Sequence, residues 1–278
     1  MNILTHNRLH QVAPAIFAEQ PSKAVSDRYG FVPTISVVDE LQDQGWYPVR
    51  AQQTHVRNDT RKMIARHMIR FRQDPDRQIK VGDSIAELVL VNSHDRSAAY
   101  QLDLGLFRLA CSNGMVTPSG NLGAIRVKHG KNIVENIIEG SVQLTQEIPN
   151  VTELVEEFRS ILISSEEALM FAQMALEIRY GDNWQVDSPV TPKDILLVRR
   201  SEDIPSSLWN VFNRVQENLL KGGIAGRSHS GRRIRTRQIQ SVTEDVRLNR
   251  ALWRLTEEFS LFKKNVITTI PKPLLLGG

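Results

Sequence analysis

The sequence predicts an α+β protein, with a mainly antiparallel β-sheet in the N-terminal half and a helical C-terminal half. From Trp46 to about His129, apolar residues alternate with polar ones, which is typical of strands with one buried face. After Gly130 the apolar residues recur about every 3.6 residues, which is typical of amphipathic helices. The 278 residues are 41% hydrophobic, so the chain is long enough to bury a sizeable core.

The part of the chain up to Pro33 has no regular pattern, and we expect it to form an arm or an extended edge. A short helix should follow over Ser36–Gln44. Thr34 or Ser36 can cap its beginning, and Gly45 is a typical residue at which a helix stops.

Three segments of the N-terminal half are predicted strands with different surroundings. In Met63–Arg72 the residues Met63, Ala65, His67, Ile69 and Phe71 should share one apolar face, and Arg66, Met68, Arg70 and Arg72 a largely cationic one. Ile85–Val91 is apolar apart from Glu87, which indicates a central strand covered on both sides. Tyr100–Leu109 reads as a half-buried strand, and Leu122–Lys128 as a further short one.

The C-terminal half contains six predicted helices. They cover about Asn132–Leu144, Val151–Ile163, Glu166–Tyr180, Thr191–Arg199, Ser207–Lys221 and a segment that begins at Ser241. Ser164 with Glu167, and Ser241 with Glu244, have the spacing of a capping box. We divide the chain into residues 1–130, an N-terminal arm and β-rich half, and residues 131–278, a helical half with a basic loop rich in glycine and arginine. No linker separates the halves, so we expect one interdependent unit.

Composition limits the class of protein. The single cysteine, Cys111, excludes an intramolecular disulfide and a cysteine-rich zinc module, which indicates a reducing compartment and a cytoplasmic protein. No stretch approaches the roughly 18 to 20 apolar residues of a membrane span, and no export signal is expected. The net charge is only +4, so the distribution of charge has to indicate any nucleic-acid binding.

The first cationic segment coincides with the predicted strand Met63–Arg72. Its candidate phosphate-binding residues are Arg57, Arg61, Lys62, Arg66, Arg70 and Arg72, and Trp46 and Tyr47 could stack on unpaired bases. The alternative interpretation is a solvated sheet face above buried aromatic rings.

The second cationic segment contains no acidic residue between Asn218 and Thr243. Its candidates are Lys221, Arg227, Arg232, Arg233, Arg235 and Arg237, interspersed with glycines that let the backbone approach a ligand. The alternative is an exposed flexible loop whose charge serves solubility.

No residue pattern indicates catalysis, and we predict no catalytic residue, no metal site and no cofactor. The seven histidines lack the spacing of a helix-borne metal site, and His67, among apolar neighbours, is expected to be a packed, hydrogen-bonded core residue. Cys111 could be a nucleophile activated by Arg108, or a buried small hydrophobe.

Several motifs resemble a known family. The segments VSDRYGFVPT (Val25–Thr34), GWYPV (Gly45–Val49), ACSNGM (Ala110–Met115) and the run from Asn213 to Trp253 are similar to the phage and plasmid protein family called domain of unknown function 932. The resemblance covers most of the chain. It implies a place in bacterial prophages or plasmids, but no reaction and no catalytic residue.

The leading hypothesis is a nucleic-acid-binding accessory protein of a phage or plasmid, which binds and anneals single-stranded DNA as a homo-oligomer. The alternative is a non-enzymatic protein that binds a host defence or replication factor, with its arginines meeting an acidic partner. A metal-dependent nuclease is the third hypothesis, against which the lack of a carboxylate or histidine cluster in the sequence counts.

Overall fold

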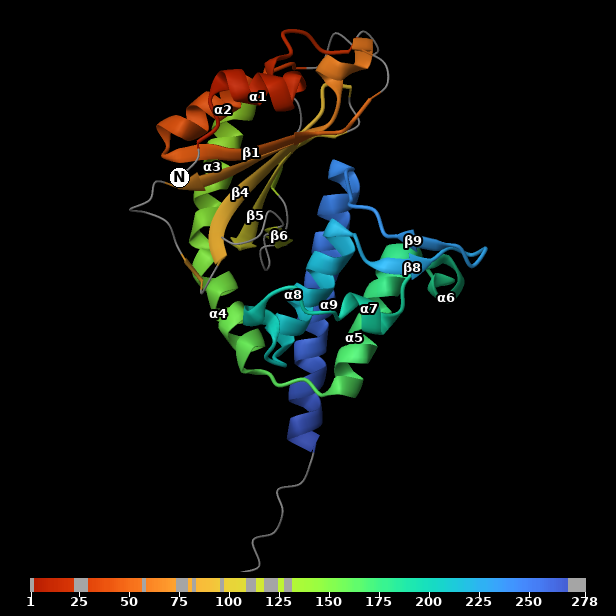
Figure 1. The fold of residues 1–278 in the computed structure, drawn as a ribbon. Coiled ribbons are helices and arrows are strands. Elements are labelled where there is room, and N and C mark those ends of the chain that lie inside the picture. Colours follow the sequence, from red (N-terminus) through yellow and green to blue (C-terminus); the bar gives the residue numbers. More distant parts are fainter. Residues whose placement is uncertain are drawn as a thin grey trace, which may run out of the picture. The chain divides into compact units, whose positions relative to one another are not determined.

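A computed structural model describes residues 3–22, 30–56, 59–73, 80–81, 84–95, 98–108, 114–117, 125–127 and 132–269 (Figure 1). Packing divides the chain into two compact units. Unit 1 comprises Met1–Glu153 and Ile239–Arg250, and unit 2 comprises Leu154–Gln238 and Ala251–Gly278. The antiparallel sheet lies in the N-terminal half and most helices lie in the C-terminal half, which confirms the predicted α+β class. The interdependence of the two halves stays a prediction.

The N-terminal part of unit 1 is not the predicted arm. It forms helix α1 (His6–Val12), the 3₁₀ helix η1 (Pro14–Phe17) and, further on, helix α2 (Thr34–Asp43). The Thr5 side chain caps α1 by accepting a hydrogen bond from the Arg8 backbone N–H at 3.3 Å. Because Leu9 is the single buried residue of α1, this helix lacks the apolar periodicity that would have predicted it.

The sheet of unit 1 is antiparallel throughout, in the order β1-β2-β4-β5-β6, with β3 paired to β4 and β7 paired to β5. Its strands are β1 (Trp46–Gln53), β2 (His67–Gln73), β3 (Lys80–Val81), β4 (Ser84–Asn92), β5 (Tyr100–Arg108), β6 (Gly114–Thr117) and β7 (Ile125–Val127). The prediction that β2 begins at Met63 is wrong. Residues Asp59–Ile64 form the 3₁₀ helix η2, and pairing with β1 starts at His67.

One face of the sheet carries the apolar core of unit 1. Ile69, Phe71, Leu88, Leu90, Leu102 and Leu104 point to this face and are almost fully buried. Helix α2 contacts β1, and helix α3 (Ile133–Gln146) contacts both β5 and α2. Figure 1 shows these two helices beside the sheet.

A buried cluster of hydrogen bonds connects α2 to this face of the sheet. The hydroxyl of Thr34, at the start of α2, lies 2.9 Å from His67 Nε2 and accepts a hydrogen bond from Asn92 Nδ2 at 3.0 Å. His94 Nε2 lies 3.2 Å from the same hydroxyl. Burial lowers the pKa of His67 to about 4, so the ring is neutral near neutral pH. The prediction that His67 is a packed, hydrogen-bonded core residue is confirmed.

The opposite face of the sheet receives the first turns of helix α9 (Val242–Thr269). Val242 and Val246 of α9 pack in one buried cluster with Met68 of β2 and with Val89 and Val91 of β4. These first turns belong to unit 1, while α9 from Ala251 onward belongs to unit 2. Both faces of β4 are therefore covered, as the nearly continuous apolar run of this strand predicted.

Unit 2 consists of helices of different lengths and one small hairpin. Its elements are the end of α4 (Ile148–Ser160), α5 (Ser165–Tyr180), α6 (Trp184–Asp187), α7 (Pro192–Ile195), the 3₁₀ helix η4 (Ser201–Asp203), α8 (Leu208–Lys221), the strands β8 (Ala225–Arg227) and β9 (Arg233–Arg235), and the rest of α9. The predicted capping box of α5 is confirmed by reciprocal hydrogen bonds between Ser164 and Glu167. The helix predicted over Thr191–Arg199 ends earlier, at Ile195.

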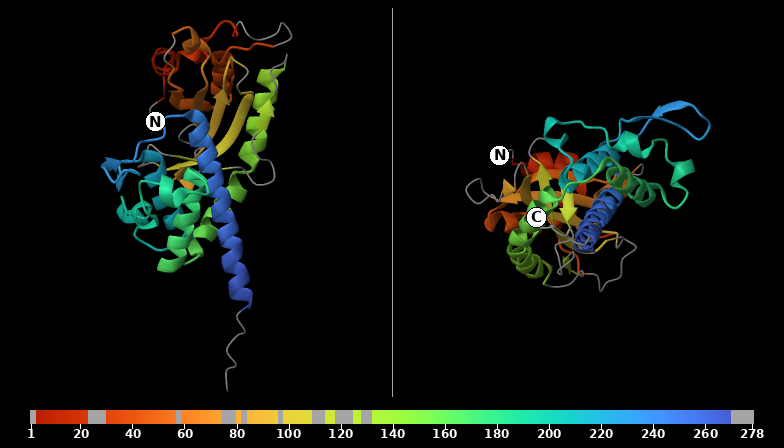
Figure 2. Two further views of the ribbon diagram at one scale, coloured as in Figure 1. Left: turned by 90° about the vertical axis from the view of Figure 1, so that its right-hand side faces the viewer. Right: turned by 90° about the horizontal axis from the view of Figure 1, so that it is seen from below.

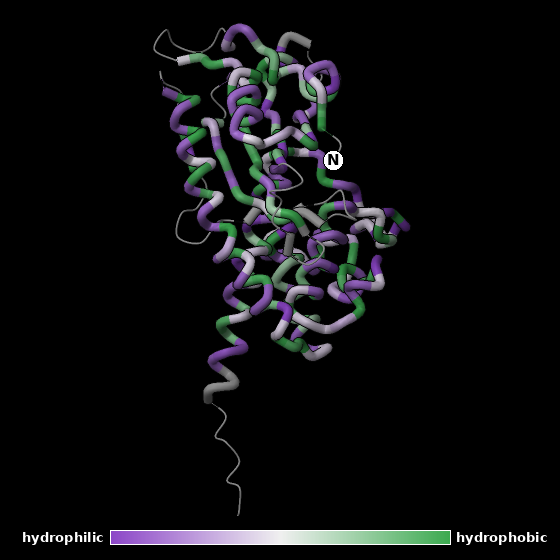
Figure 3. Tube along the Cα trace, turned by 90° about the vertical axis from the view of Figure 1, so that its left-hand side faces the viewer, coloured by the Kyte–Doolittle hydropathy of each residue, from purple (hydrophilic) through white to green (hydrophobic). Residues whose placement is uncertain are grey.

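Aromatic rings fill the centre of unit 2. The Trp253 ring lies 5.3 Å from the Phe158 ring and 6.2 Å from the Phe212 ring, measured between centroids, in edge-to-face contacts. Phe171 of α5 meets Phe259 of α9 in the same way at 5.6 Å. Hydrophobic and hydrophilic residues alternate along the longer helices, as Figure 3 shows, and the buried residues of α5 and α8 give each of these helices an apolar face toward the core.

Replacing Trp253 by alanine should lower the free energy of unfolding by about 3–5 kcal/mol, because the large cavity left among packed rings cannot close completely. Leu261→Ala on the same helix is the control, since Leu261 is 57% exposed and its loss should change stability by less than about 0.5 kcal/mol. Chemical denaturation measures both. Equal effects of the two variants would contradict the assigned core.

Candidate nucleic-acid interface

The arginines of strand β2 form ion pairs inside the sheet. Arg70 Nε donates to Glu87 Oε2 at 2.7 Å, and Arg72 Nε donates to Glu87 Oε1 at 2.9 Å. Glu87 has no exposed surface, and the side chains of Arg70 and Arg72 are 7% and 17% exposed. Both oxygens of one buried carboxylate therefore occupy two of the guanidinium groups that the sequence offered for phosphate.

Helix α9 covers the same face with further polar contacts. Gln52 Nε2 donates to the backbone carbonyl of Gln240 at 2.9 Å, and Arg66 donates to the hydroxyl of Thr243. Arg250 pairs with Asp103, whose side chain is fully buried in β5. The face that the sequence predicts as cationic is thus a docking surface for the start of α9, within unit 1.

Ionisable groups at this contact are shifted by burial. Burial raises the pKa of Asp245 to about 6, although the cations Arg50 and Arg70 and a hydrogen bond from Asn249 act in the opposite direction. Burial also raises the pKa of Asp103, against the attraction of Arg250. Glu87 contacts two cations, and its position inside an apolar strand was the one signal in the sequence for this arrangement.

The remaining candidates of the first segment lie apart from the buried pairs. Arg61 and Lys62 are exposed on η2, while Arg57 lies outside the described residues. Trp46 is 3% exposed and Tyr47 is half-buried, so the Trp46 ring is part of the core. Cys111 also lies outside the described residues.

The second cationic segment is a hairpin, where the sequence predicted a loop. Strands β8 and β9 pair with the register Ala225↔Arg235, Gly226↔Ile234 and Arg227↔Arg233. Gly231, with a φ of 78°, supplies the left-handed conformation of the turn, and its N–H donates to the carbonyl of Ser228 at 2.8 Å. Figures 1 and 2 show the hairpin extending away from the helices of unit 2. Strands of three residues are too short to show a period of two in a sequence.

The two faces of the hairpin differ in chemistry. Residues directly opposite each other in an antiparallel pair share a face, and neighbours along a strand alternate. Arg227, Arg233 and Arg235 therefore share one face, which we call the arginine face, and Gly226 and Ile234 share the other. All three arginines are exposed.

Contacts with residues 189–190 orient the hairpin. A Cβ atom at Gly226 would lie 2.1 Å from the Pro189 carbonyl oxygen and 3.0 Å from Val190 Cγ1, so only glycine fits there. The Arg227 N–H also donates to the Pro189 carbonyl at 2.8 Å. Because the Gly226 face meets Pro189 and Val190, the arginine face points away from them.

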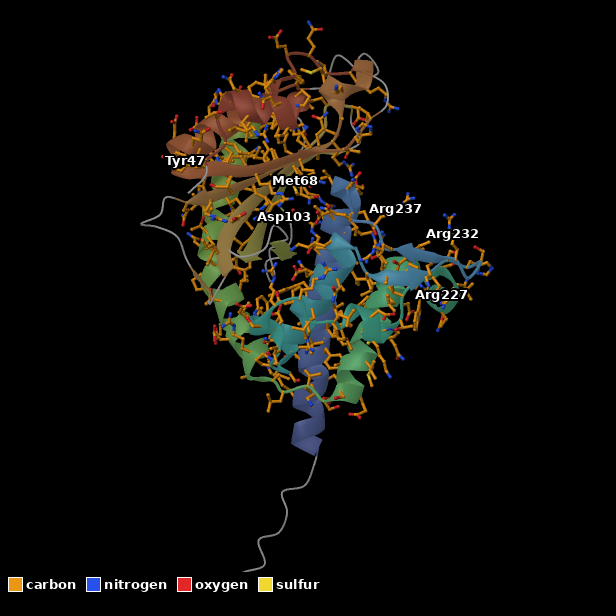
Figure 4. All side chains as sticks on the ribbon, viewed as in Figure 1. Tyr47, Met68, Asp103, Arg227, Arg232 and Arg237 are labelled. Carbon is orange, nitrogen blue, oxygen red and sulfur yellow. The ribbon has the colours of Figure 1, made fainter. Side chains whose placement is uncertain are left out.

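Two further arginines flank the arginine face. Arg232 and Arg237 are exposed, and Figure 4 shows the side chains of Arg227, Arg232 and Arg237 extending from this segment. Lys221, the first cation of the segment, instead pairs with Glu217 at 2.6 Å on helix α8. Residues 227–237 therefore present five exposed arginines and no acidic residue.

Within the described ranges, no helix combines the length and apolar character needed to cross a membrane. Across the same residues, His, Cys, Asp and Glu side chains form no group of three or more suited to a metal ion.

Comparison with known proteins identifies the family. The protein-family model described as "Domain of unknown function (DUF932)" matches residues 21–253. The chain belongs to this family. Two relatives from Escherichia coli (strain K12), UPF0380 protein YafZ and UPF0380 protein YfjQ, are each 39% identical over 254 residues, which is 91% of this chain and 90% of their own length. No solved structure matches the chain.

Membership of the DUF932 family confirms the resemblance seen in the sequence, and the family description names no activity. The matched region includes the sheet, the first turns of α9 and the hairpin β8–β9. Thr34 is the last residue of the motif VSDRYGFVPT, and its hydroxyl is the centre of the buried hydrogen-bond cluster with His67, Asn92 and His94. That residue of the motif therefore has a structural role.

Arg70→Ala should lower the free energy of unfolding by about 3–5 kcal/mol, because it leaves the buried Glu87 carboxylate with one cation in place of two. Arg233→Ala on the exposed hairpin is the matched control and should change stability by less than about 0.5 kcal/mol. Thermal and chemical unfolding measure both variants. If Arg70→Ala were as stable as Arg233→Ala, the strand arginines would be free to serve a ligand.

Asp245 should make folding dependent on pH. Its folded pKa of about 6 exceeds the usual value of about 3.9, so the folded state keeps a proton that the unfolded state loses. The free energy of unfolding should therefore fall by roughly 2 kcal/mol, for this group, as the pH rises from about 4 to about 6. Asp245→Asn should gain stability relative to the wild type over that window.

Denaturant titrations of both proteins at several pH values measure this difference. Asp187→Asn, at an exposed position, is the control and should follow the wild type. A difference between Asp245→Asn and the wild type that stays constant with pH would contradict the shifted pKa.

Proposed function

We propose that this protein binds the phosphate backbone of single-stranded DNA through the arginine face of the hairpin β8–β9. The observation that supports the proposal is the set of exposed guanidinium groups of Arg227, Arg233 and Arg235 on one face of a ribbon without acidic residues. A guanidinium group bonds phosphate through two parallel N–H donors.

The spacing of the arginines suits a polyanion. Residues two apart on a β-strand lie about 6.6–6.8 Å apart. Arg233 and Arg235 have this separation on the same face, so each can bond a different phosphate of one flexible strand. A nucleic-acid strand that runs along the hairpin could also contact Arg232 and Arg237 with its neighbouring phosphates.

The ribbon also places like charges opposite each other. Arg227 and Arg233 are a directly opposed pair, and like charges in this position destabilise a two-stranded ribbon. Both arginines are exposed to solvent. An anion bound between them would relieve the repulsion, so this pair favours a phosphate ligand over an empty surface.

The strand arginines are not part of the proposed surface. Contact of Arg70 or Arg72 with phosphate would require breaking an ion pair with the buried Glu87, and contact of Arg66 would require breaking its hydrogen bond to Thr243. In the hairpin, Arg227 donates to the exposed carbonyl of Gly231 at 3.2 Å and Arg235 to that of Gly223 at 2.8 Å, and exchanging such exposed hydrogen bonds for phosphate costs less than breaking a buried ion pair.

Neutralised phosphates repel a complementary strand less, while the unpaired bases stay available. The protein would then speed the annealing of single strands without nucleotide hydrolysis, in keeping with an accessory role in a phage or plasmid. An oligomer would extend the bound length of strand.

A variant with Arg227, Arg233 and Arg235 replaced by alanine should bind single-stranded oligonucleotides more weakly and with less dependence on salt. Each phosphate contact contributes about 0.7 to the slope of log affinity against log salt, so the loss of three contacts should reduce the slope by about 2. Fluorescence anisotropy across a salt series measures the slope, and mixing labelled complementary strands measures annealing.

The control variant has the same net charge. It replaces Arg8, Lys193 and Arg254, which are exposed and lie outside the hairpin, by alanine and should retain the wild-type slope. Equal slopes for both variants would show general charge attraction only. No binding of DNA by the wild type would instead favour a protein partner with an acidic surface, which the same arginine face would bind.

A further inference from the structure

A cavity lies beside the hairpin, and residues 234–237 form part of its wall. Its volume is about 290 Å³, and it lies entirely within unit 2. This is near the lower end of the roughly 300–1,000 Å³ of small-molecule sites, so it suits a single ring system better than a large ligand. The function proposed above does not use it.

About half of the cavity wall is apolar. Val190, Leu219, Ile224 and Ile234 contribute aliphatic side chains, and Tyr180 contributes an aromatic ring. Ile234 is 36% exposed and shares its face of the ribbon with Gly226, so this wall is reached from solvent. Arg179 stacks on Tyr180 with its guanidinium carbon 5.6 Å from the ring centroid.

Part of the cavity lining is cationic. Arg179, Arg235 and Arg237 belong to it, and Arg235 is also a member of the arginine face. A ligand that fills an apolar slot while carrying negative charge at its edge would be complementary to both. An unpaired nucleotide has this combination, because its base is flat and largely apolar on its faces and its phosphate is anionic.

Polar groups at the wall are mostly engaged inside the protein. The amide of Asn218 donates to the carbonyls of Ile195 and Leu197, both at 2.8 Å, and its oxygen accepts from Arg199 Nε at 2.5 Å. The Thr236 hydroxyl accepts from the Ile224 N–H at 3.1 Å. Apart from its three arginines, the wall therefore offers little hydrogen bonding that could distinguish one base from another, which favours binding of any base by stacking and apolar contact.

We propose that this cavity binds one unpaired nucleobase of a single strand whose phosphates lie on the arginines of the hairpin. The inference rests on the proposed function and adds the reason for a single-strand preference. A base within a duplex is stacked and paired, and unstacking it costs a few kcal/mol. Duplex DNA would therefore contact the arginines without filling the cavity.

The test compares two single-stranded ligands of equal length and charge. One is an oligothymidine of about 12 nucleotides, a length within the roughly 4–16 nucleotides that single-strand-binding folds cover, and the other is the same strand without its bases. The wild type should bind the thymidine strand about tenfold more tightly, which corresponds to about 1.4 kcal/mol. Ile234→Phe, which fills the cavity, and Tyr180→Ala, which removes its ring, should each reduce this ratio toward one. Both should bind the abasic strand as the wild type does.

Leu162→Phe is the control, because Leu162 is 75% exposed in unit 2 and outside the cavity lining, and it should keep the tenfold ratio. Thermal unfolding shows which variants are folded, and either cavity variant suffices for the test. Equal binding of both strands by the wild type, or an unchanged ratio in the folded cavity variants, would overturn the base site and leave the phosphate-binding function standing. Failure to bind either strand would overturn the proposed function as well.

Discussion

Glu87 is a carboxylate with no exposed surface in a strand that is apolar on both sides of it, and the organisation of unit 1 follows from how this charge is satisfied. An isolated buried carboxylate costs far more free energy than a domain has to spare, so it must be paired and hydrogen-bonded. Arg70 and Arg72 provide this pairing from the neighbouring strand in register. These two arginines are thereby fixed on the face of the sheet that the first turns of α9 cover.

The covering helix meets the same requirement. A sheet face with Arg50, Arg70 and Asp103 on it can be buried only beneath an element that carries opposite charges and polar groups at matching positions. The first turns of α9 supply Arg250 as the partner of Asp103, around the apolar contact of Val242 and Val246. Asp245 lies near Arg50 and Arg70, but burial outweighs their attraction and raises its pKa. The ion pair therefore favours this docking position, and apolar burial contributes most of the attraction.

The sequence predicts the periodic parts of this fold and misses what depends on long-range pairing. The alternation in β2 correctly separates Ile69 and Phe71 from Met68 and Arg70, because strand periodicity is local. It cannot show that Val242, more than 150 residues further along, covers the cationic side. Helix α1 was missed because only Leu9 of its seven residues is buried, and β8 and β9 because three residues carry no measurable period. The sequence predicts the arginines of β2 and those of the hairpin equally as phosphate-binding residues. Only their burial in the structure distinguishes the two sets.

The distinction between the two sets of arginines comes down to what lies opposite each of them. In the sheet, Arg70 faces a fixed carboxylate, so its charge is neutralised within the protein. In the hairpin, Arg227 faces Arg233, and Gly226 lets the other side of the ribbon approach Pro189 so closely that the arginines have to face outward. A glycine at 226 is thus a condition for the direction of the charges, although it bears none itself. Any side chain there would push the ribbon from residues 189–190 and open the cavity that Ile234 borders, so the direction of the arginines and the shape of the cavity depend on the same close contact.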